Sequence, residues 1–539
     1  MAIRGTTRPA RESGCRHTAE PVPLRTTLIR PRRGYLRTLR AKSRQVRTEI
    51  RGRDVPGWSV RGAKVGVMLV GQRDGMRRGS GGMSVETVDA VVVGMGPGGE
   101  DVAARLARGG LNVVGVEGRL VGGECPYFAC VPTKIMVRAA DALAEAGRVN
   151  ELAGEAVVKP EWGPVAARIR DEATDNWDDS AAVERFEKAG GTFVRGWGRI
   201  SAPGEVTVAT EQGERVFRAR AVVLNPGTAP AVPPLPGLAD TPYWTNREAV
   251  RVTELPASLI VLGGGPVGSE FAQLFARFGV RVTIVVPKRL VPQDEPEASA
   301  LLAEVFEAEG ITVRSGARAA GVEYDGREFT VAMSEGEPVR GERLLVATGR
   351  RTDFASLGIG VLGLDEHAKS IDVDERMRAA DGLWVIGDVA GHGAFTHMSM
   401  YQARIAAADI LGESGETAQY RAVPRVTFTD PEVGSVGLTE EQARAAGLTV
   451  RVGKYDIPAS TRGWIHKVGN EGFIKLVEDA DRGVLVGATS MGPTGGEVLS
   501  ALTLAVHAEV PTSTLRTMIY AYPTFHRAIE AALDALPSS

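Results

Sequence analysis

Hydrophobic and polar positions near the start of the main body of the chain follow a strand, turn, helix and strand order. A continuous apolar run over residues 90–93 leads into the glycine-rich turn that begins at Gly94. A helical stretch over 100–108 comes next, and a second apolar run covers 111–117. Short apolar runs bounded by glycine indicate buried strands, so this pattern predicts two parallel strands joined by a helix.

The same order returns farther along the chain. Ser258-Leu-Ile-Val-Leu precedes a second glycine turn, a helix through Phe278 and a strand over 280–286. Two copies predict two nucleotide-binding units, and we interpret the proline-rich stretch 230–236 as the linker between them. From about Arg425 onward strands come first and helices afterwards, which predicts a separate α+β layer.

Charge is distributed unevenly along the 539 residues. The net charge is −2, yet residues 1–82 hold 18 Arg and 2 Lys against 5 acidic residues. We interpret this Arg-rich part either as a start codon placed too early, with Met83 as the natural beginning, or as a targeting or nucleic-acid-binding arm. Outside that hypothesis we expect no nucleic-acid partner. No apolar run approaches the roughly 18 residues of a membrane span, so we expect a cytoplasmic protein with no membrane partner.

The first glycine turn has the spacing of a dinucleotide-binding motif. Gly94, Gly96 and Gly99 allow a tight turn, close approach of a pyrophosphate and close packing of the following helix, whose amino terminus faces the phosphates. Glu117 ends the second strand, where a carboxylate can accept hydrogen bonds from a ribose. A lone motif of this kind is often only a turn, but here two copies occur in the same context.

The second motif differs at its discriminating position. Its glycines have the same spacing, at Gly263, Gly265 and Gly268. Val286 stands where an acidic residue would bind the ribose of NAD, and Lys288 and Arg289 follow it. An uncharged residue followed by two cations favours a 2′-phosphate, and therefore NADPH, with NADH as the alternative. The other interpretation is a solvated pair of surface cations.

Two of the three cysteines lie five positions apart, at Cys125 and Cys130, and the third is Cys15. So few cysteines exclude a framework of structural disulfides. No nearby His or Cys completes a zinc site, so we expect no metal ion. A disulfide needs Cα atoms within about 7 Å, whereas five residues of helix rise about 7.5 Å, so the pair must straddle a turn entering a helix. Two unrelated buried thiols are the alternative.

Taken together, these motifs resemble the class I pyridine nucleotide-disulfide oxidoreductases, which include dihydrolipoamide dehydrogenase, glutathione reductase and mercuric reductase. The resemblance spans about residues 85–535. Besides the two glycine motifs it rests on Gly122-Gly-Glu-Cys-x4-Cys-Val-Pro-Thr-Lys134, Gly268-Ser-Glu270, Ala347-Thr-Gly-Arg, Ile386-Gly-Asp388, Phe428-Thr-Asp-Pro-Glu and Tyr522-Pro-Thr.

The resemblance implies an α/β fold with two Rossmann-like domains and a carboxy-terminal α+β dimerisation domain. The expected parts are an FAD-binding domain at 83–240, an NAD(P)-binding domain at 241–360, a central segment at 361–418 that returns to the FAD domain, and a dimerisation domain at 419–539. It also implies a homodimer.

Roles for individual residues follow from the same resemblance. The FAD pyrophosphate would lie over the first glycine turn, Glu117 would hold the adenosine ribose, and Asp388 would bind the ribityl chain. Lys134 and Glu270 would pair beside flavin N5. Further expected cofactor-binding residues are Gly123, Glu124, Gly227, Gly349, Gly387 and Thr396.

The implied reaction is NAD(P)H-driven reduction of the Cys125–Cys130 disulfide through FAD. Cys130 would be the thiolate against the flavin and Cys125 the interchange thiol that meets a small-molecule electron acceptor. We expect that acceptor to be a small disulfide. The alternatives are a quinone, dye or metal-ion reductase, and a catalytically weak redox-sensing or nucleic-acid-binding flavoprotein.

Three departures from the family pattern bear on the acceptor. Where the family has a His-Pro-Thr-x-x-Glu acid-base pair, this chain has Tyr522-Pro-Thr-Phe-His526, and either side chain is a candidate substitute. Asn225-Pro replaces the usual Ala-Thr at the first domain junction. Tyr127 and Phe128 make the loop between the cysteines bulkier, and we expect both changes to reshape the acceptor side.

Overall fold

The computed structural model of the chain describes residues 84–537. Both interpretations of residues 1–82 concern positions outside this range, as does Cys15. Within the described range, no helix is long and apolar enough to cross a membrane.

The first domain is built on a mostly parallel sheet. Its spatial order is β16 (Arg378–Ala380), β17 (Leu383–Val385), β6 (Gly213–Leu224), β1 (Val85–Val93), β2 (Val113–Glu117) and β3 (Thr192–Arg195). Only β16 runs antiparallel to its neighbour on this path, and the hairpin β4 (Trp197–Ala202) and β5 (Glu205–Thr210) joins the edge of β6. Residues 90–93 of β1 are all buried, which explains their uninterrupted apolar sequence in a central parallel strand.

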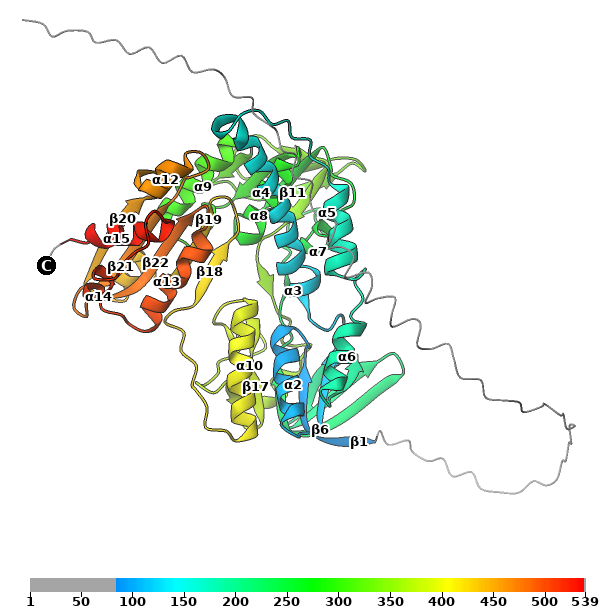
Figure 1. Ribbon diagram of the computed structural model, residues 1–539. Coiled ribbons are helices and arrows are strands. Elements are labelled where there is room, and N and C mark those ends of the chain that lie inside the picture. Colours follow the sequence, from blue (N-terminus) through cyan, green and yellow to red (C-terminus); the bar gives the residue numbers. More distant parts are fainter. Residues whose placement is uncertain (1–83, 538–539) are drawn as a thin grey trace, which may run out of the picture. The chain divides into compact units, whose positions relative to one another are not determined.

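Helices α2 (Pro97–Arg108) and α10 (Thr396–Leu411) lie side by side against this sheet (Figure 1). Their packing is very close, because a Cβ added at Gly98 would lie 2.0 Å from Ser399 Oγ. These helices are about 300 positions apart in the sequence, and β16, β17 and α10 thus join the first domain from far along the chain.

The second domain repeats the parallel arrangement. Its sheet has the order β10 (Thr312–Ser315), β9 (Arg281–Val286), β8 (Ser258–Leu262) and β14 (Arg343–Val346), with all pairs parallel. Helices α8 (Pro266–Arg277) and α9 (Pro296–Ala308) follow β8 and β9 along the chain. A small antiparallel sheet is formed by β11 (Ala319–Tyr324), β12 (Phe329–Met333) and β13 (Val339–Gly341).

The proline-rich stretch 230–236 is partly paired, which the linker prediction missed. The short strand β7 (Ala229–Pro230) pairs antiparallel with β15 (Arg350–Arg351), and Ala231 donates its N–H to the Gly349 carbonyl at 2.9 Å. The two crossings between the domains therefore run side by side. A pairing between segments 120 residues apart leaves no local periodicity to read.

The carboxy-terminal domain is built on an antiparallel sheet. Its order is β18 (Pro424–Thr427), β19 (Glu432–Gly437), β22 (Val484–Gly492), β21 (Phe473–Asp479) and β20 (Val450–Asp456). Helix α13 (Gly495–His507) packs on this sheet, and α14 (Thr512–Arg516) and α15 (Ala528–Asp534) follow it.

The predicted order of strands first and helices afterwards is wrong in part of this domain. Helices α11 (Glu440–Ala445) and α12 (Thr461–His466) lie between strands. Each has only six residues, too few for an apolar pattern to repeat over two helical turns, and begins at a hydroxyl cap, Thr439 or Ser460.

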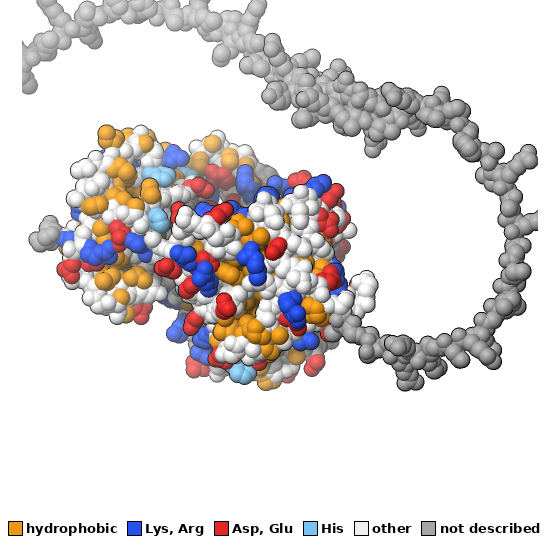
Figure 2. Space-filling model, turned by 90° about the horizontal axis from the view of Figure 1, so that it is seen from below, with side chains coloured by type: hydrophobic (Ala, Val, Ile, Leu, Met, Phe, Trp, Pro, Cys, Tyr) orange, Lys and Arg blue, Asp and Glu red, His pale blue; other side chains and the backbone are white. Residues whose placement is uncertain are grey.

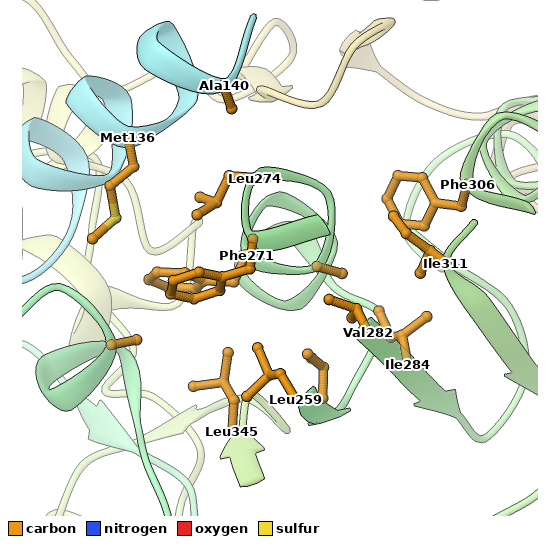
Figure 3. Packing of buried hydrophobic residues seen from close by; sticks show 14 of the residues in the cluster. Met136, Ala140, Leu259, Phe271, Leu274, Val282, Ile284, Phe306, Ile311 and Leu345 are labelled. Atoms are coloured by element: carbon orange, nitrogen blue, oxygen red, sulfur yellow. The ribbon is translucent and has the colours of Figure 1, made fainter. Parts of the chain in front are cut away.

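Helix α4 (Cys130–Leu152) packs against α8 of the second domain. Figure 3 shows Met136 and Ala140 of α4 on one side of α8, near Leu274, while Phe271 of α8 lies between them and the strands of the second sheet. This shared core fixes the start of α4 relative to both domains. The remaining helices are α3 (Glu124–Tyr127), α5 (Gly163–Arg168), α6 (Ser180–Lys188) and α7 (Asn246–Ala249).

Candidate active site

The first glycine turn joins β1 to α2 and has almost no spare room. Gly94 has φ +92°, and a Cβ there would lie 2.2 Å from the Asn225 carbonyl oxygen. A Cβ at Gly99 would lie 2.0 Å from the Gly94 carbonyl oxygen. Gly96 ends the turn as the N-cap of α2, a 12-residue helix whose first N–H groups are available to an anion. These residues fit the pyrophosphate of a dinucleotide.

Glu117 lies at the end of β2 with its carboxylate directed back to this turn. It accepts hydrogen bonds from the backbone N–H groups of Met95 at 2.9 Å and Arg119 at 2.8 Å. Burial raises the pKa of Glu117, and these two hydrogen bonds oppose that rise. The carboxylate is thus oriented, and its other lone pairs can accept from ribose hydroxyls.

Asn225 departs from the family pattern, and the sequence predicts that it reshapes the acceptor side. In the structure it forms part of the wall of the first glycine turn. Its side chain is buried, donates to the Gly94 carbonyl at 3.3 Å and accepts from Ser399 Oγ at 3.0 Å. The domain junction therefore ties the glycine turn to α10. The sequence signal was present, because a polar residue closes the apolar end of β6.

Gly387 and Asp388 follow β17 on the same side of the sheet. Gly387 has φ +78° and donates its N–H to Gln402 Oε1 at 2.7 Å. Asp388 accepts from Thr228 Oγ1 at 2.6 Å, and Thr228 accepts in turn from Arg350 Nε at 2.7 Å. Gly227 precedes Thr228, has φ +64°, and a Cβ there would meet no atom within 4 Å. This junction thus leaves open space at Gly227, the residue before the threonine that donates to Asp388.

The two cysteines straddle a turn entering a helix, as expected from their spacing. Cys125 lies in the single turn α3, and Cys130 is the first residue of α4. Cys130 Sγ lies 3.5 Å from the hydroxyl of Thr396, the first residue of α10.

The pair shares its protons unequally. A hydrogen bond from Cys125 lowers the pKa of Cys130 to about 6, aided by the Thr396 hydroxyl and the charge of Lys134 against the opposing effect of burial. The same hydrogen bond raises the pKa of Cys125, with a contribution from burial. Near neutral pH the reduced pair therefore carries one thiolate, on Cys130, and one thiol, on Cys125.

Lys134 lies one helical turn after Cys130 and pairs with Glu270 of α8. Its Nζ is 2.5 Å from Glu270 Oε2, and it lies 4.4 Å from the centre of the Phe428 ring. Glu270 is 7% exposed, and its second oxygen accepts from the Phe428 backbone N–H at 2.9 Å. A buried carboxylate with two donors holds the cation in one place.

Tyr127 and Phe128 do not line the acceptor side, so that expectation is wrong. Both side chains are buried, at 6% and 8% exposure, within the core shared by α4 and α8. Apolar rings next to a large core gain more from burial than from exposure at an open site. The two aromatic side chains therefore anchor the loop between the cysteines to this core.

The second glycine turn is as tight as the first but more open in front. A Cβ at Gly268 would lie 1.9 Å from the Gly263 carbonyl oxygen, whereas a Cβ at Gly265 or Gly349 would meet no atom within 4 Å. Open space thus lies before the amino terminus of α8, a 12-residue helix, and fits an exchangeable nucleotide.

The three residues expected to distinguish NADPH from NADH differ in their accessibility. Val286 is fully buried at the end of β9, and Lys288 is exposed. Arg289 donates to the carbonyl oxygens of Pro292 at 3.1 Å and Asp294 at 2.8 Å. Its guanidinium is thus directed to the chain's own backbone, which the sequence pattern could not show.

Tyr522 and His526 lie in the carboxy-terminal domain, on the loop before α15. Both are exposed, and the Arg527 guanidinium lies 5.5 Å from the centre of the Tyr522 ring. Within residues 84–537 no hydrogen bond connects either side chain to the cysteine pair, so one chain alone does not bring them together. The described part of the chain also holds no cluster of three or more His, Cys, Asp or Glu side chains able to bind a metal ion.

The face of the described chain seen in Figure 2 carries Lys, Arg, Asp and Glu side chains in alternation, with hydrophobic side chains between them. Charges of both signs are interspersed, so this face presents no extended basic surface of the kind that binds nucleic acid.

Comparison with known proteins agrees with this geometry. A family model described as pyridine nucleotide-disulphide oxidoreductase matches residues 88–408, and the corresponding dimerisation domain matches residues 423–533. A dihydrolipoyl dehydrogenase of Thermus scotoductus is 33% identical, covering 84% of this chain and 98% of that protein. A mercuric reductase of Shewanella putrefaciens is 31% identical, covering 82% of this chain and 80% of that protein.

The fold has similar solved structures. The Cu(II) complex of the HOCl-induced flavoprotein disulfide reductase RclA from Escherichia coli has a TM-score of 0.71 and 26% identity, covering 84% of this chain and 99% of that one. These matches confirm the predicted fold of two Rossmann-like domains and a dimerisation domain. The chain belongs to the pyridine nucleotide-disulphide oxidoreductase family and is an FAD-dependent flavoprotein oxidoreductase that uses a pyridine nucleotide.

Proposed function

We propose that this protein is a homodimeric reductase that takes electrons from NADPH and passes them, through FAD and the Cys125–Cys130 pair, to a small disulfide. The observation that carries the proposal is the position of the pair: Cys125 lies in α3, Cys130 begins α4, and the Thr396 hydroxyl lies 3.5 Å from Cys130 Sγ. The hydrogen bond between the two thiols and the Thr396 hydroxyl both favour the thiolate on Cys130. A dithiol poised in this way is suited to exchange chemistry.

FAD, bound over the first glycine turn, would supply two-electron transfer between the nicotinamide and the cysteine disulfide. Lys134 would place a fixed positive charge beside the flavin ring, with Glu270 orienting it. Glu117 and Asp388 would hold the ribose and ribityl hydroxyls. These residues come from both domains, so the core between α4 and α8 also aligns the charge with the ring.

The exchange reaction follows from the chemistry of the pair. Cys125 gives its proton to Cys130 along their hydrogen bond and attacks one sulfur of the acceptor disulfide, and the acceptor's S–S bond breaks to release one thiolate. That thiolate takes the proton from Cys130, and Cys130, again a thiolate, then attacks Cys125 Sγ, which closes the Cys125–Cys130 disulfide and releases the second half of the acceptor as a thiolate. Because the reduced pair held one proton, the second released thiolate takes its proton from a donor outside the pair.

Tyr522 of the partner subunit is our candidate for protonating the released thiolate. In one chain the carboxy-terminal domain exposes large apolar side chains around this loop, including Ile519 at 96% and Trp464 at 75% exposure. Exposed apolar area of this kind favours an interface, and the matched dimerisation domain supports a second copy of the chain as the partner. His526 of the partner subunit is the alternative donor.

For the nucleotide we propose NADPH, recognised through Lys288. Val286 offers no carboxylate to a ribose 2′-hydroxyl, and Lys288 is exposed two positions later. Because Arg289 donates to backbone carbonyls, Lys288 carries this proposal alone.

Anaerobic titration of the purified protein with NADPH tests the proposed electron path. We expect a long-wavelength charge-transfer band from the Cys130 thiolate against the flavin, and its loss in Cys130→Ser. Cys125→Ser should keep the band but abolish disulfide turnover, with Cys15→Ser as the matched control that changes neither. Unaltered disulfide turnover in Cys125→Ser would refute the function.

Reduction of a metal ion or quinone is the second candidate. Tyr522 favours it, because a neutral phenol is a poor base for thiol exchange but a serviceable ligand or donor. The named relatives also include a mercuric reductase and a Cu(II) complex. Acceptor profiling separates the candidates: brisk turnover of Cu(II) or quinones without turnover of glutathione disulfide would favour the second.

A further inference from the structure

The loop between the two cysteines is held at both of its central carbonyl groups by side chains from distant parts of the chain. Asn246 Nδ2 donates to the Phe128 carbonyl at 2.7 Å, and Trp177 Nε1 donates to the Tyr127 carbonyl at 3.2 Å. The next carbonyl of the loop, that of Ala129, accepts from Thr133 Oγ1 of α4 at 2.8 Å.

Asn246 also reaches the other side of Cys125. Its amide nitrogen lies 3.2 Å from Glu124 Oε2, and Arg247 Nε donates to Glu124 Oε1 at 2.8 Å. Asn246 is only 6% exposed, so its amide is committed to these two partners. One buried side chain therefore fixes the residue before Cys125 and a residue two before Cys130.

The donors are themselves held firmly. The Arg251 guanidinium lies 4.9 Å from the centre of the Phe128 ring and 4.8 Å from that of Trp177. Trp177 ends a run of three left-handed residues, with φ +59° at the tryptophan, which the surrounding contacts must maintain. Its indole is thus placed by packing on both sides.

Asn246 is also anchored to the second domain. Two residues earlier, Trp244 donates to the Leu344 carbonyl at 2.7 Å and accepts from the Val346 N–H at 2.8 Å, so it continues the edge of the nucleotide-binding sheet beside β14. A capping box between Thr245 and Glu248 then starts α7. The path from the sheet edge to the cysteine loop is two residues long.

We propose that Asn246 is a positioning residue for the redox pair, supported by Trp177: together they restrain the loop so that the two sulfur atoms stay within reach of each other. The inference rests on the proposed role of the pair. A restrained loop loses less conformational entropy when the S–S bond forms, so the effective concentration of one thiol at the other is higher. The hydrogen bonds from Asn246 and Trp177 to the loop therefore stabilise the disulfide relative to the dithiol.

Equilibration with glutathione buffers tests this without any turnover. In the exchange the pair goes from one thiol and one thiolate to one S–S bond, while glutathione disulfide gains the two electrons and becomes two thiols, with one proton from the pair and one from solvent. The FAD-loaded, full-length protein is equilibrated anaerobically at a series of glutathione ratios, acid-quenched and alkylated. Mass spectrometry of the tryptic peptide 120–134, which holds both cysteines and excludes Cys15, then gives the oxidised fraction.

We expect Asn246→Leu, which removes both donated hydrogen bonds at similar volume, to lower the oxidation equilibrium constant about tenfold, or about 30 mV for this two-electron couple. Asn246→Asp, which keeps the shape but cannot donate, should shift it in the same direction. Trp177→Phe keeps an aromatic ring against Arg251 and should lower the oxidation equilibrium constant about threefold, as expected for the loss of one weaker hydrogen bond.

The matched control is Asn150→Leu. Asn150 lies near the carboxy end of α4, the helix that begins at Cys130, and its amide bonds backbone groups of Ala156, 20 positions from the nearer cysteine. It should leave the equilibrium constant unchanged. FAD content and thermal midpoint are measured for every variant, and Asn246→Asp replaces Asn246→Leu in the comparison if the latter loses FAD.

The positioning role of Asn246 would be overturned if both Asn246 variants kept the wild-type equilibrium constant or formed a more stable disulfide. Either result would leave the proposed function intact. A wild-type peptide 120–134 that never forms its internal disulfide would instead overturn the proposed function, on which this inference depends.

Discussion

The two nucleotide-binding turns of this chain have the same glycine spacing but different surroundings. At the first, the Asn225 side chain ties the Gly94 carbonyl to Ser399 of α10, and a Cβ at Gly96 would lie 3.3 Å from the same amide. At the second, a Cβ at Gly265 would meet nothing within 4 Å. A turn walled by several segments suits a cofactor that stays, whereas an open one suits a nucleotide that must leave after each turnover.

The largest expected effect comes from the same substitution at both turns. Gly99→Ala places a Cβ 2.0 Å from a backbone carbonyl, and Gly268→Ala places one at 1.9 Å. A forced backbone shift of this kind costs about 1–3 kcal/mol, roughly 5- to 150-fold in affinity. Gly99→Ala should be purified with little FAD, whereas Gly268→Ala should keep FAD and lose NADPH affinity. Flavin absorbance and NADPH titration measure the two.

A control separates local strain from general damage. Gly110→Ala, at a glycine with open space around its Cβ position but with φ +88°, strains the backbone near α2 without entering the turn. Its FAD content should stay near that of wild type. Equal loss of both nucleotides in Gly99→Ala and Gly268→Ala would remove the distinction between the turns.

The pH dependence of the charge-transfer band tests the cysteine pair, which lies with the first of the two nucleotide-binding turns. The hydrogen bond from Cys125 lowers the pKa of Cys130 to about 6. An acid with a lowered pKa is ionised above its midpoint, so the band should be full above about pH 7 and lost as the pH falls through 6. One unit below the midpoint about a tenth of the thiolate remains. Spectrophotometry of the reduced protein gives the midpoint.

Thr396→Val is the companion variant for that titration. It removes the hydroxyl that lies 3.5 Å from Cys130 Sγ and helps to lower its pKa, so the midpoint should rise. NADPH affinity should not change. A midpoint near the ordinary thiol value in wild type would mean that the pair does not share its protons as described.

Asn225→Ala removes the wall of the first turn without touching the second. The Gly94 carbonyl and the Ser399 hydroxyl lose their partner in a buried place, which costs about 1–3 kcal/mol. We expect a lower thermal midpoint and FAD affinity weakened about tenfold, with NADPH affinity within about twofold of wild type. Asn225→Asp keeps the acceptor for Ser399 and should lose less. FAD affinity equal to wild type would contradict the assigned role.

The smallest expected effect is at Lys288. Lys288→Ala should raise the KM for NADPH about threefold to fivefold and leave that for NADH unchanged, because a solvent-exposed charge contributes about 1 kcal/mol or less. Arg289→Ala is the matched control, since its guanidinium donates to Pro292 and Asp294 backbone carbonyls. A larger effect at Arg289 than at Lys288 would mean that Arg289, and not Lys288, contacts the 2′-phosphate.

Much of the fold could be predicted because its signals are local. The apolar run 90–93 forms the end of β1, which begins at Val85, and α2 ends at Arg108 as expected. The cysteine spacing predicts a turn entering a helix, and α4 begins at Cys130. Each of these signals depends on neighbouring residues. The short helices α11 and α12 were missed because six residues do not complete two helical turns, so no apolar period repeats. The pairing of β7 with β15 was missed because its partners are far apart in the chain.

The sequence by itself determined the two nucleotide turns, the family and the position of the cysteine pair, because glycine torsions, apolar periodicity and residue spacing act over a few residues. Only the tertiary structure decided that Tyr127 and Phe128 face the core, that Arg289 bonds its own backbone, and that Asn225 and Asn246 hold the walls of the site. Asn225 and Ser399 are 174 positions apart. A hydrogen bond of that range depends on how two helices and a sheet pack, and no local pattern encodes it.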